Sequence, residues 1–373
     1  MLTKRTGLAA LAVACLAAVL PPAGAQAPAA GTLDIYFIDV EGGQATLFVS
    51  PTRESLLVDT GFPGDRDTGR ILEVMKDAGL RQLDHLLLTH YHVDHVGNAQ
   101  NLAARIPVKH FYDHGATAEP DREQVPGFQK AYADLAAKAA RTSLKPGDKV
   151  PFAGVDWRIV TAAAQAIKTP LGGAPGAGAA NPDCNGFESK NTTQDPDNGY
   201  SVGSVIAFGK FRTIDLGDLY WDREFDLMCP ANRVGTVDLY IVSHHGSDLS
   251  GSAALVHALQ PRVAIMDNGA RKGGSASTFA VLESSPGLED LWQLHWSVNG
   301  GTEHNAPGAF IANVEDNAAL AALLTAPPGG GGRGNASANH APAHLIKVSA
   351  REDGTFTVSN TRNGFSKTYK PRR

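Results

Sequence analysis

Cysteine is scarce in this chain, which has three in 373 residues. Only Cys184 and Cys229 lie beyond the N-terminal segment, and neither belongs to a Cys-x-x-Cys pair. The spacing therefore argues against a thiolate metal site. In an oxidising compartment the two residues could form one structural disulfide that pins the loop around Cys184, although spacing alone does not establish the bond.

The chain also lacks an excess of basic residues. Lysine and arginine total 33 against 38 aspartates and glutamates, and the net charge at pH 7 is −5. A protein whose main partner is long nucleic acid normally has a basic surface. The composition therefore argues against that partner. The small anionic substrate that we expect follows instead from the motifs described below. The hydrophobic fraction of 43% is typical of a globular protein, and the oligomeric state is left open.

One long apolar run stands near the N-terminus. A basic pair precedes the apolar stretch 8–20, prolines follow, and Ala23-Gly24-Ala25 forms an A-x-A cleavage site. The pattern predicts a signal peptide over residues 1–25 and a periplasmic or secreted mature chain. The run is too short and wrongly flanked for a permanent membrane span. A lipoprotein modified at Cys15 is the second interpretation, because apolar residues continue beyond that cysteine.

Short apolar segments recur through the rest of the chain, in two strand-rich halves that also contain helical patterns. The expected strands are 33–40, 45–49, 55–58, 83–88, 108–112, 150–152, 155–160, 202–208, 211–216, 238–242, 263–266, 344–348, 355–358 and 365–369. The expected helices are 71–80, 95–104, 128–140, 253–259 and 277–283. This order predicts a single α/β domain over residues 31–373, with two sheets between helices. A loop insertion near 163–199 and a Gly/Pro-rich excursion near 326–342 interrupt it.

Three imidazoles and a carboxylate follow directly after the apolar run 86–88, as His90, His92, Asp94 and His95. Alternate side chains of an extended backbone share a face, so His90 and His92 can point at one ion. Asp94 and His95, just past the strand end, can face a second ion. Imidazole nitrogen with carboxylate oxygen suits zinc and its first-row neighbours. Four ligand-type residues in six positions disfavour the alternative, a solvated polar loop.

Two later strand ends carry further candidate ligands. The predicted strand 211–216 leads into Gly217-Asp218, whose carboxylate could bridge two ions, although a strand-end aspartate is often only a turn or cap residue. The predicted strand 238–242 leads to His244-His245. An isolated histidine pair is more often structural, but a third strand-end cluster in one chain favours a shared metal site.

Together these motifs resemble those of the metallo-β-lactamase superfamily of hydrolases. The resemblance is carried by His90-x-His92-x-Asp94-His95, Gly217-Asp218, His244-His245-Gly246-Ser247 and the early turn Asp59-Thr60-Gly61. Within the superfamily the chain looks most similar to the hydrolase domain of competence-type DNA-uptake proteins and to related exported phosphoesterases. Asp39-Val40 and the Gly42-Gly43-Gln44 run carry that closer likeness. The match spans roughly Leu33 to Trp296, and the six-residue His/Asp motif is its most specific part.

The resemblance implies an αββα sandwich of two mixed β-sheets flanked by helices, with a site for two divalent metal ions at the rim between the sheets. By carry-over, His90 and His92 would hold the first ion, and Asp218 would bridge. Asp94, His95 and one of His244 and His245 would hold the second. His245 is the favoured ligand and His244 the favoured substrate contact, although the sequence leaves this choice open. Zn²⁺ is the expected metal, with Mn²⁺ or iron as alternatives.

The chain departs from the family pattern at two positions. Most members supply another histidine to the first ion between the two halves, where this chain offers Asn198. Related competence-type members also lack that histidine, so Asn198 or a water would take the position, and the first ion should bind more weakly. Ala45 stands where the competence-type turn normally carries an aspartate, which weakens the case for a nuclease specifically.

The family likeness implies hydrolysis by a metal-bound hydroxide, with Asp94 and His244 as the catalytic candidates. His244 could donate a hydrogen bond to the developing oxyanion or protonate the leaving group. Four further predictions are less direct. Asp59 would orient a ligand histidine, Lys272 would contact an anionic substrate group, His304 would reach the site from a late loop, and Tyr91 would line the entrance. For Lys272 and His304 the competing interpretation is an ordinary solvated side chain.

We therefore expect an exported dinuclear metal-dependent hydrolase that acts on phosphoester or phosphodiester bonds. An acyl hydrolase that uses the same site on a β-lactam or lactone is the first alternative. A non-catalytic metal-binding module is the second.

Overall fold

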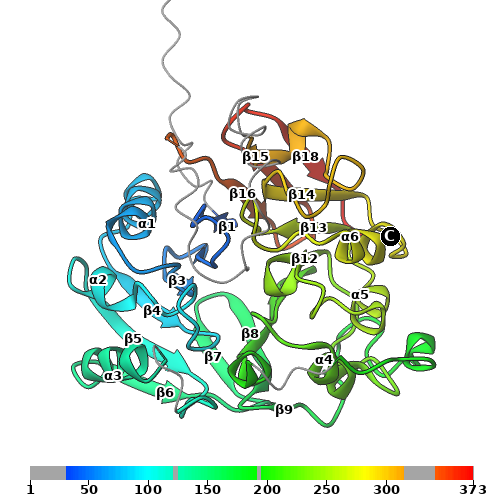
Figure 1. Cartoon of the computed structure of the whole chain (residues 1–373), viewed down its shortest axis with the longest axis horizontal. Coiled ribbons are helices and arrows are strands. Elements are labelled where there is room, and N and C mark those ends of the chain that lie inside the picture. The colour runs from blue at the N-terminus through cyan, green and yellow to red at the C-terminus, as the bar shows by residue number, and fades with distance from the viewer. Residues whose placement is uncertain (1–30, 121–124, 191–194, 315–340, 373) are drawn as a thin grey trace, which may run out of the picture.

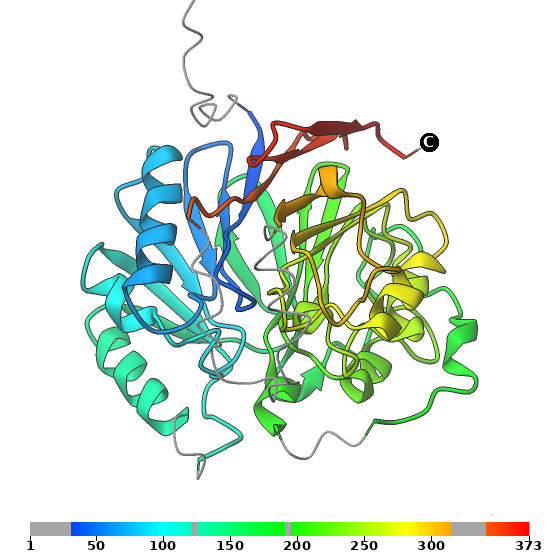
Figure 2. The ribbon, with the colours of Figure 1, turned by 45° about the horizontal axis from the view of Figure 1, so that its top comes forward.

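The computed structural model describes residues 31–120, 125–190, 195–314 and 341–372. Two β-sheets stack in the middle of the molecule, with helices on the outer faces (Figure 1). Figure 2 shows the blue and cyan helices on one side of the sheets and the green and yellow helices on the other. The expected α/β sandwich of two mixed sheets is confirmed. The predicted signal peptide 1–25 and positions 326–340 of the predicted excursion lie outside the described residues.

The first sheet has nine described strands in the order β18-β17-β16-β1-β2-β3-β4-β5-β6. They are β1 (Leu33–Phe37), β2 (Thr46–Val49), β3 (Ser55–Val58), β4 (Leu83–Leu87), β5 (Val108–Asp113), β6 (Ala140–Ser143), β16 (Ile346–Ala350), β17 (Phe356–Asn360) and β18 (Ser366–Tyr369). Strands β3 to β6 run parallel, and the other neighbouring pairs are antiparallel. The helices of this half are α1 (Asp65–Asp77), α2 (Ala99–Ala103) and α3 (Val125–Ala136).

The second sheet follows the order β15-β14-β13-β12-β11-β10-β8-β7, with β9 paired to β8. Its strands are β7 (Lys149–Phe152), β8 (Val155–Ala162), β9 (Gln165–Ala166), β10 (Gly203–Phe208), β11 (Phe211–Asp215), β12 (Leu239–Ile241), β13 (Val263–Met266), β14 (Asp290–His295) and β15 (Ile311–Asn313). Its helices are α4 (Trp221–Met228), α5 (Ala253–Leu259) and α6 (Ala276–Glu283). Short 3-10 turns are η1 (Pro182–Cys184), η2 (Pro196–Tyr200), η3 (Ser243–Gly246) and η4 (Gly308–Phe310).

The predicted helix 128–140 is wrong at its C-terminal end. The helix stops at Ala136, and residues from Ala140 pair in parallel with β5 as the edge strand β6. Helix propensity is a weak preference even for alanine, and the backbone hydrogen bonds that β5 offers override it. The sequence patterns also missed β14, β15 and α4. The segment of α4 directly follows a candidate ligand, which hid its helical spacing.

Three apolar layers hold the sandwich together. Strand β1 shows the alternation that builds them, since Ile35 and Phe37 face the second sheet while Tyr36 packs under the helices of the first half. A third cluster, which includes Leu255 and Phe279, lies between the second sheet and α4 to α6. The central strands of each sheet, such as β1 to β3 and β12 to β13, therefore bury both faces, which accounts for their almost continuous apolar sequences.

The parallel strands place several loops at one rim of the sandwich. The loops that follow β3 and β4 in the first sheet contact those that follow β11, β12 and β13 in the second. Ligands of open α/β sheets gather at the carboxyl ends of strands because the loops there converge. The candidate motifs stand in these loops.

Cys184 and Cys229 form a disulfide, as the cysteine count suggested. The bond ties the insertion near 163–199 to the end of α4. The same junction is reinforced by Asn181, whose side-chain amide donates to the carbonyls of Met228 and Ala254 at 3.2 and 2.7 Å. The disulfide therefore has the structural role that the sequence predicted.

Replacing both Cys184 and Cys229 with serine should lower the free energy of unfolding by about 4 kcal/mol, because the bond closes a loop of 45 residues. Denaturant unfolding of the double variant beside the oxidised wild type measures this difference. Wild type unfolded in excess reductant is the control and should match the variant. Equal stability of variant and oxidised wild type would contradict the prediction.

Candidate metal centre

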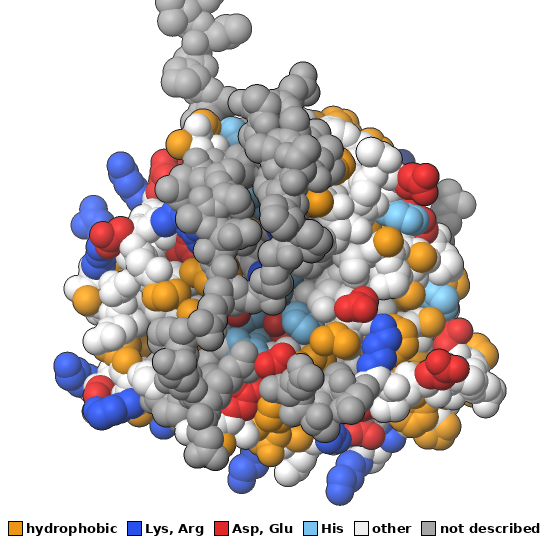
Figure 3. Space-filling view, in the orientation of Figure 1, with side chains coloured by type: hydrophobic (Ala, Val, Ile, Leu, Met, Phe, Trp, Pro, Cys, Tyr) orange, Lys and Arg blue, Asp and Glu red, His pale blue; other side chains and the backbone are white. Residues whose placement is uncertain are grey.

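The loop after β4 carries its four candidate ligands into the middle of the rim. His90, His92, Asp94 and His95 are 0%, 9%, 7% and 0% exposed. The backbone turns back on itself there, since the amide of His95 donates to the carbonyl of His92 at 3.0 Å. Figure 3 shows histidine and acidic side chains gathered near the centre of the face that contains the rim. Buried imidazoles and carboxylates require partners of opposite charge.

Gly43 makes this loop possible from the other side. A Cβ on Gly43 would lie 2.5 Å from the carbonyl oxygen of Asp94, and the amide of Gln44 donates to that same oxygen at 3.1 Å. The Gly42-Gly43-Gln44 run, noted above only as a likeness, therefore packs directly on the ligand loop. Only glycine allows the two backbones to come so close.

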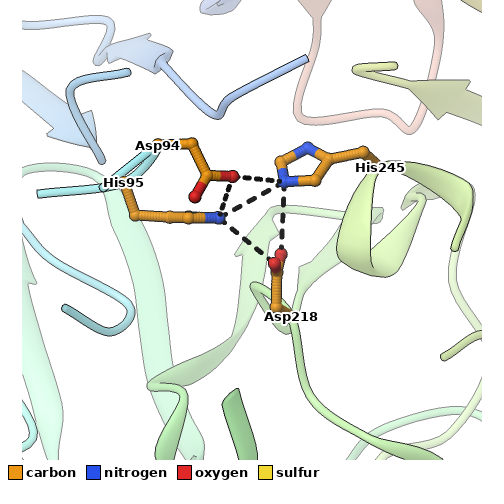
Figure 4. A group of neighbouring side chains, drawn as sticks. All are labelled: Asp94, His95, Asp218 and His245. Carbon is orange, nitrogen blue, oxygen red and sulfur yellow. Dashed lines mark hydrogen bonds and ion pairs between the residues drawn. The ribbon is translucent and has the colours of Figure 1, made fainter. Parts of the chain in front are cut away.

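Four side chains meet at one point, as Figure 4 shows for Asp94, His95, Asp218 and His245. One ligand atom from each lies within 4.8 Å of the others. His95 Nε2 is 3.3 Å from oxygens of both Asp94 and Asp218. His245 Nε2 is 3.3 Å from Asp94, 3.5 Å from Asp218 and 3.3 Å from His95 Nε2. The structure thus brings together residues that are up to 151 positions apart in the chain (94 to 245).

The donor set of this group fits a divalent cation. His95 Nδ1 hydrogen-bonds Asp59 at 2.7 Å, and His245 Nδ1 lies 3.4 Å from Asp267. When Nδ1 of each ring carries its proton toward these carboxylates, the two Nε2 lone pairs face each other and two carboxylates. Such lone pairs repel unless a cation or extra protons lie between them. An Asp218 oxygen, Oδ1, is also buried without a hydrogen-bond partner. Carboxylate-backed imidazoles are typical of metal ligands.

The pKa values of these groups report the same charge balance. Burial alone would raise the pKa of the Asp218 carboxyl, but the imidazoles of His244, His95 and His245 outweigh burial and hold it well below its usual value. Burial would conversely lower the pKa of His95, yet the surrounding carboxylates raise it well above its usual value. The centre therefore draws positive charge strongly, and a cation is the alternative to protons there.

His90 and His92 form the first-ion group of the sequence prediction. His90 Nε2 lies 3.1 Å from His92 Nδ1 and 3.9 Å from the nearest Asp218 oxygen. Asp218 therefore stands between the two groups, in the place that a bridging carboxylate needs. Burial, followed by the neighbouring imidazoles, lowers the pKa of His90 well below its usual value, so the ring stays neutral and available as a donor.

His244 and His245 turn their rings to the same carboxylate from consecutive positions. Their φ angles are 55° and 54°, a left-handed conformation that is uncommon for residues other than glycine and is typical of functional sites. His244 Nε2 is 3.4 Å from Asp218, and its Nδ1 is 3.2 Å from the Ser250 hydroxyl. His245 contacts both Asp94 and Asp218. His244 touches one carboxylate only and keeps 16% of its side chain exposed.

The other predicted site residues have mixed outcomes. Asp59 lies on His95 Nδ1 and also accepts from the Thr89 amide and hydroxyl at 2.8 and 2.6 Å, in the expected orienting position. Lys272 reaches the centre, but its ammonium group contacts Asp94, and its contact with an anionic substrate group stays a prediction. Asn198 donates to the Tyr220 hydroxyl at 2.9 Å, and its carbonyl oxygen is buried without a partner.

Two expectations are wrong in geometric terms. His304 does not contact the described ligand groups, because its ring stacks on Phe279 and lies 3.6 Å from Glu283, both on α6. Tyr91 does not line an entrance. It is fully buried, its hydroxyl donates to the carbonyl of Gly115 at 2.6 Å, and its ring packs in the core beneath the helices of the first half.

Several functional neighbours escaped the sequence patterns. Asp267, in the loop after β13, lies 3.4 Å from His245 Nδ1. Glu119 lies 3.3 Å from His92 Nε2, and Asp195 belongs to the same group of ligand-type side chains. No signal in the sequence marks Glu119, since it stands in an irregular loop. A weak signal marks Asp267, which follows strand β13 directly, as the candidate ligands follow their strands.

A second buried polar cluster lies beside the ligand loop, and we interpret it as a structural link. His295 Nε2 is 2.7 Å from Asp39, and Arg70 contacts Asp39 and Glu41 at 3.0 and 3.1 Å. These side chains join the end of β1, helix α1 and the end of β14. The guanidinium of Arg70 and the imidazole of His295 each contact both carboxylates, which gives these buried acidic groups partners within the protein.

The chain contains one match to the serine-hydrolase pattern G-x-S-x-G, at Gly199-Tyr200-Ser201-Val202-Gly203. A nucleophilic serine needs an exposed position on a turn from strand to helix. Ser201 instead precedes strand β10, is 0% exposed, and its hydroxyl has no hydrogen-bond partner. Ser201 is therefore not a candidate nucleophile.

Comparison with known proteins agrees with this geometry. The family model for the metallo-β-lactamase superfamily matches residues 38–172. The chain is 24% identical over 252 residues to ComE operon protein 3 of Bacillus subtilis, a match covering 63% of this chain and 28% of that protein. It is 35% identical over 82 residues to an atrochrysone carboxyl ACP thioesterase of Pseudocercospora fijiensis, a match covering 22% of this chain and 24% of the thioesterase.

Among solved structures, the metallo-β-lactamase fold protein YhfI from Bacillus subtilis aligns with a TM-score of 0.41 at 14% identity, covering 70% of this chain and 96% of YhfI. The matches span only about a quarter of the length of the curated relatives. The family match includes the ligand loop 90–95 and the Asp59 turn, which the structure places at one rim. Residues 38–172 therefore match the metallo-β-lactamase superfamily, and the two mixed sheets flanked by helices agree with that match.

Proposed function

We propose that the chain is an exported dinuclear metal-dependent hydrolase that acts on phosphoester or phosphodiester bonds. The observation that carries the proposal is the convergence of Asp94, His95, Asp218 and His245 within 4.8 Å, next to His90 and His92. His90 and His92 would hold the first ion, Asp94, His95 and His245 the second, and Asp218 would bridge. When bound, two such ions lower the pKa of a shared water and neutralise charge on substrate oxygens.

The protein's own residues orient the ligands and exclude water around them. Asp59 and Asp267 fix the rings of His95 and His245 from behind, so that the inner nitrogens point to the centre. His244 is the partly exposed imidazole of the site and is held by Ser250 at 3.2 Å. It can donate a hydrogen bond to an oxygen of the substrate or give a proton to the leaving group. Lys272 places its ammonium group beside Asp94, and this positive charge favours an anionic substrate.

Zn²⁺ is the proposed metal, because four imidazoles with two carboxylates form a nitrogen-rich donor set. Mn²⁺ or iron remain the alternatives. Asn198, with its buried and unpartnered carbonyl oxygen, is proposed to stand in the region where most family members supply a further histidine. It contacts Tyr220, whose ring centre is 5.9 Å from that of His244, so this part of the wall adjoins the site.

Export and domain organisation complete the proposal. The Cys184–Cys229 disulfide supports an oxidising compartment, periplasmic or extracellular, in agreement with the signal peptide proposed for residues 1–25. None of the helices in the described ranges combines the length and apolarity needed to cross a membrane. Residues 31–373 are proposed to form a single catalytic domain.

One comparison favours a second candidate function. The partial match to a thioesterase, an enzyme of acyl chemistry, covers 22% of this chain. The same centre could act on a β-lactam, lactone or thioester carbonyl, since it would polarise an acyl oxygen as readily as a phosphoryl oxygen. The substrate's electrophile therefore has to be tested directly.

Purified protein should hydrolyse bis(p-nitrophenyl) phosphate in a chelator-sensitive manner, and His92→Ala should reduce the rate by at least about 100-fold. His257→Ala is a matched control, because His257 contacts Ser284 and Asp183 rather than the centre. Assays with nitrocefin and a thioester run in parallel. Turnover of the acyl substrates alone would transfer the function to the second candidate, and undiminished phosphodiester hydrolysis by metal-free protein would rule out the proposal.

A further inference from the structure

Each imidazole that faces the second ion position has a carboxylate behind it. Asp59 lies on the outer nitrogen of His95 at 2.7 Å, and Asp267 lies near the outer nitrogen of His245 at 3.4 Å. His92 shows the same arrangement at the first ion position. Its Nδ1 faces His90 at 3.1 Å, and its Nε2 lies 3.3 Å from each oxygen of Glu119.

We propose that Glu119 is the positioning residue of His92, an inference that rests on the metal centre of the proposed function. With Nδ1 directed at the first ion, Nε2 carries the ring proton and can donate it only outward. Glu119 is 6% exposed and presents both carboxylate oxygens to that proton at equal distance. Such a carboxylate fixes the tautomer and the ring orientation and makes the inner nitrogen a stronger donor.

The protein holds Glu119 in place through Asp197. One oxygen of Asp197 accepts from the amide of Ala118 at 2.7 Å, and the other accepts from the amide of Tyr91 at 2.8 Å. The Asp197 amide donates to Glu119 at 3.2 Å. Asp197 is itself 0% exposed, so the loop that carries Glu119 is tied to the residue preceding His92. These hydrogen bonds fix the position of the Glu119 carboxylate, as a residue that orients His92 requires.

The first ion should depend on this support more than the second. Two imidazoles and a shared carboxylate serve it, whereas Asp94 and two imidazoles serve the second alongside the same carboxylate. A site with fewer ligands loses more of its affinity for the ion when one ligand side chain can rotate. Removal of Glu119 should therefore weaken one of the two bound ions selectively.

A different role for Glu119 is also chemically conceivable. His92, Glu119 and Asp195 offer ligand atoms within 4.8 Å of one another, which would suit an ion on the outer side of the ring. A neutral imidazole has only one lone pair, so His92 cannot serve both an inner and an outer ion. Removal of a ligand would lower the number of ions bound per chain, whereas removal of a positioning residue would leave that number unchanged.

Binding of Zn²⁺ alone, measured by competition with a chromophoric chelator, separates these roles. Glu119→Ala should still bind two ions per chain at saturation, with the weaker site reduced about 10- to 100-fold in affinity. Glu119→Gln keeps a hydrogen-bond acceptor at the same place and should recover part of that loss. Glu188→Ala, at an exposed position of the neighbouring insertion, is the matched control and should bind as wild type. Circular dichroism checks that all variants are folded.

Three outcomes would overturn the inference. Unchanged affinity of both ions in Glu119→Ala would show that His92 needs no such partner. Loss of one whole equivalent in both Glu119 variants would make Glu119 a ligand. Absence of bound zinc in the wild type would remove the proposed metal centre itself, and this result is read before any variant is compared.

Discussion

Asp218→Asn should abolish metal-dependent hydrolysis and leave at most one ion per chain. Among the described candidate ligands, Asp218 is the carboxylate that contacts both groups, at 3.9 Å from His90, 3.3 Å from His95 and 3.5 Å from His245. The asparagine side chain is uncharged, so it cannot replace the negative charge of Asp218 beside the imidazoles. Its amide nitrogen would also face imidazole nitrogens, which require an anion or a cation as a neighbour. Loss of residues that merely orient ligands costs 10- to 100-fold in affinity or activity. Loss of the bridge itself should therefore cost more than about 100-fold.

The measurement combines the initial rate on the substrate found by the hydrolysis panel with elemental analysis of the same sample. Asp226→Asn is the matched control, because Asp226 is an exposed carboxylate on α4, paired only with Arg223 on the same helix. The control should retain wild-type activity and metal content. An Asp218→Asn protein with two ions and an undiminished rate would show that this carboxylate does not bridge.

Removal of the metal should lower the stability of the whole domain. The centre joins loops from both sheets, and its carboxylates and imidazoles are almost completely buried. An ion at a free concentration about 1,000 times its dissociation constant stabilises the folded state by about 4 kcal/mol. Chelation should therefore reduce the melting temperature, and added zinc should restore it.

The magnitude is read from thermal unfolding of wild type and of Asp218→Asn, each with and without chelator. The variant has lost the shared ligand, so its melting temperature should respond far less to chelation than that of wild type. An effect of equal size in both proteins would place the stabilising ion elsewhere. A melting temperature of wild type that does not respond to chelator at all would argue against an ion that binds tightly at the rim.

The ligand loop was predictable from sequence because its information is local. His90, His92, Asp94 and His95 follow one strand within six positions, and the geometry of a strand end already brings them together. Asp218 and the pair at 244 and 245 were predictable because each follows a recognisable apolar strand. The convergence of the three segments followed from the family likeness, not from local pattern.

What the sequence missed depends on contacts between distant segments. Glu119 reaches His92 through a loop without regular structure, held by Asp197 from another part of the chain. Lys272 could be placed near the site, but its contact with Asp94, 178 positions away, follows only from the packing of two loops. Tyr91 was predicted to line the entrance because it alternates with His90 and His92. Alternation separates the faces of a strand but does not tell which face a helix or a second loop will cover.

The edge strand β6 shows the same limit for the fold. The alanine-rich stretch has helical propensity to position 140, and nothing within it signals that β5 has an open edge. Pairing with β6 satisfies backbone groups along that open edge of β5. Helix ends and edge strands are set by neighbours that are remote in sequence.

The metal content of natively purified protein tests the central claim most directly. We predict close to two divalent ions per chain in wild type, measured by elemental analysis after purification without chelator, and at most one in Asp218→Asn. Wild-type protein that is folded but holds no metal, and binds none when zinc is added, would contradict the account.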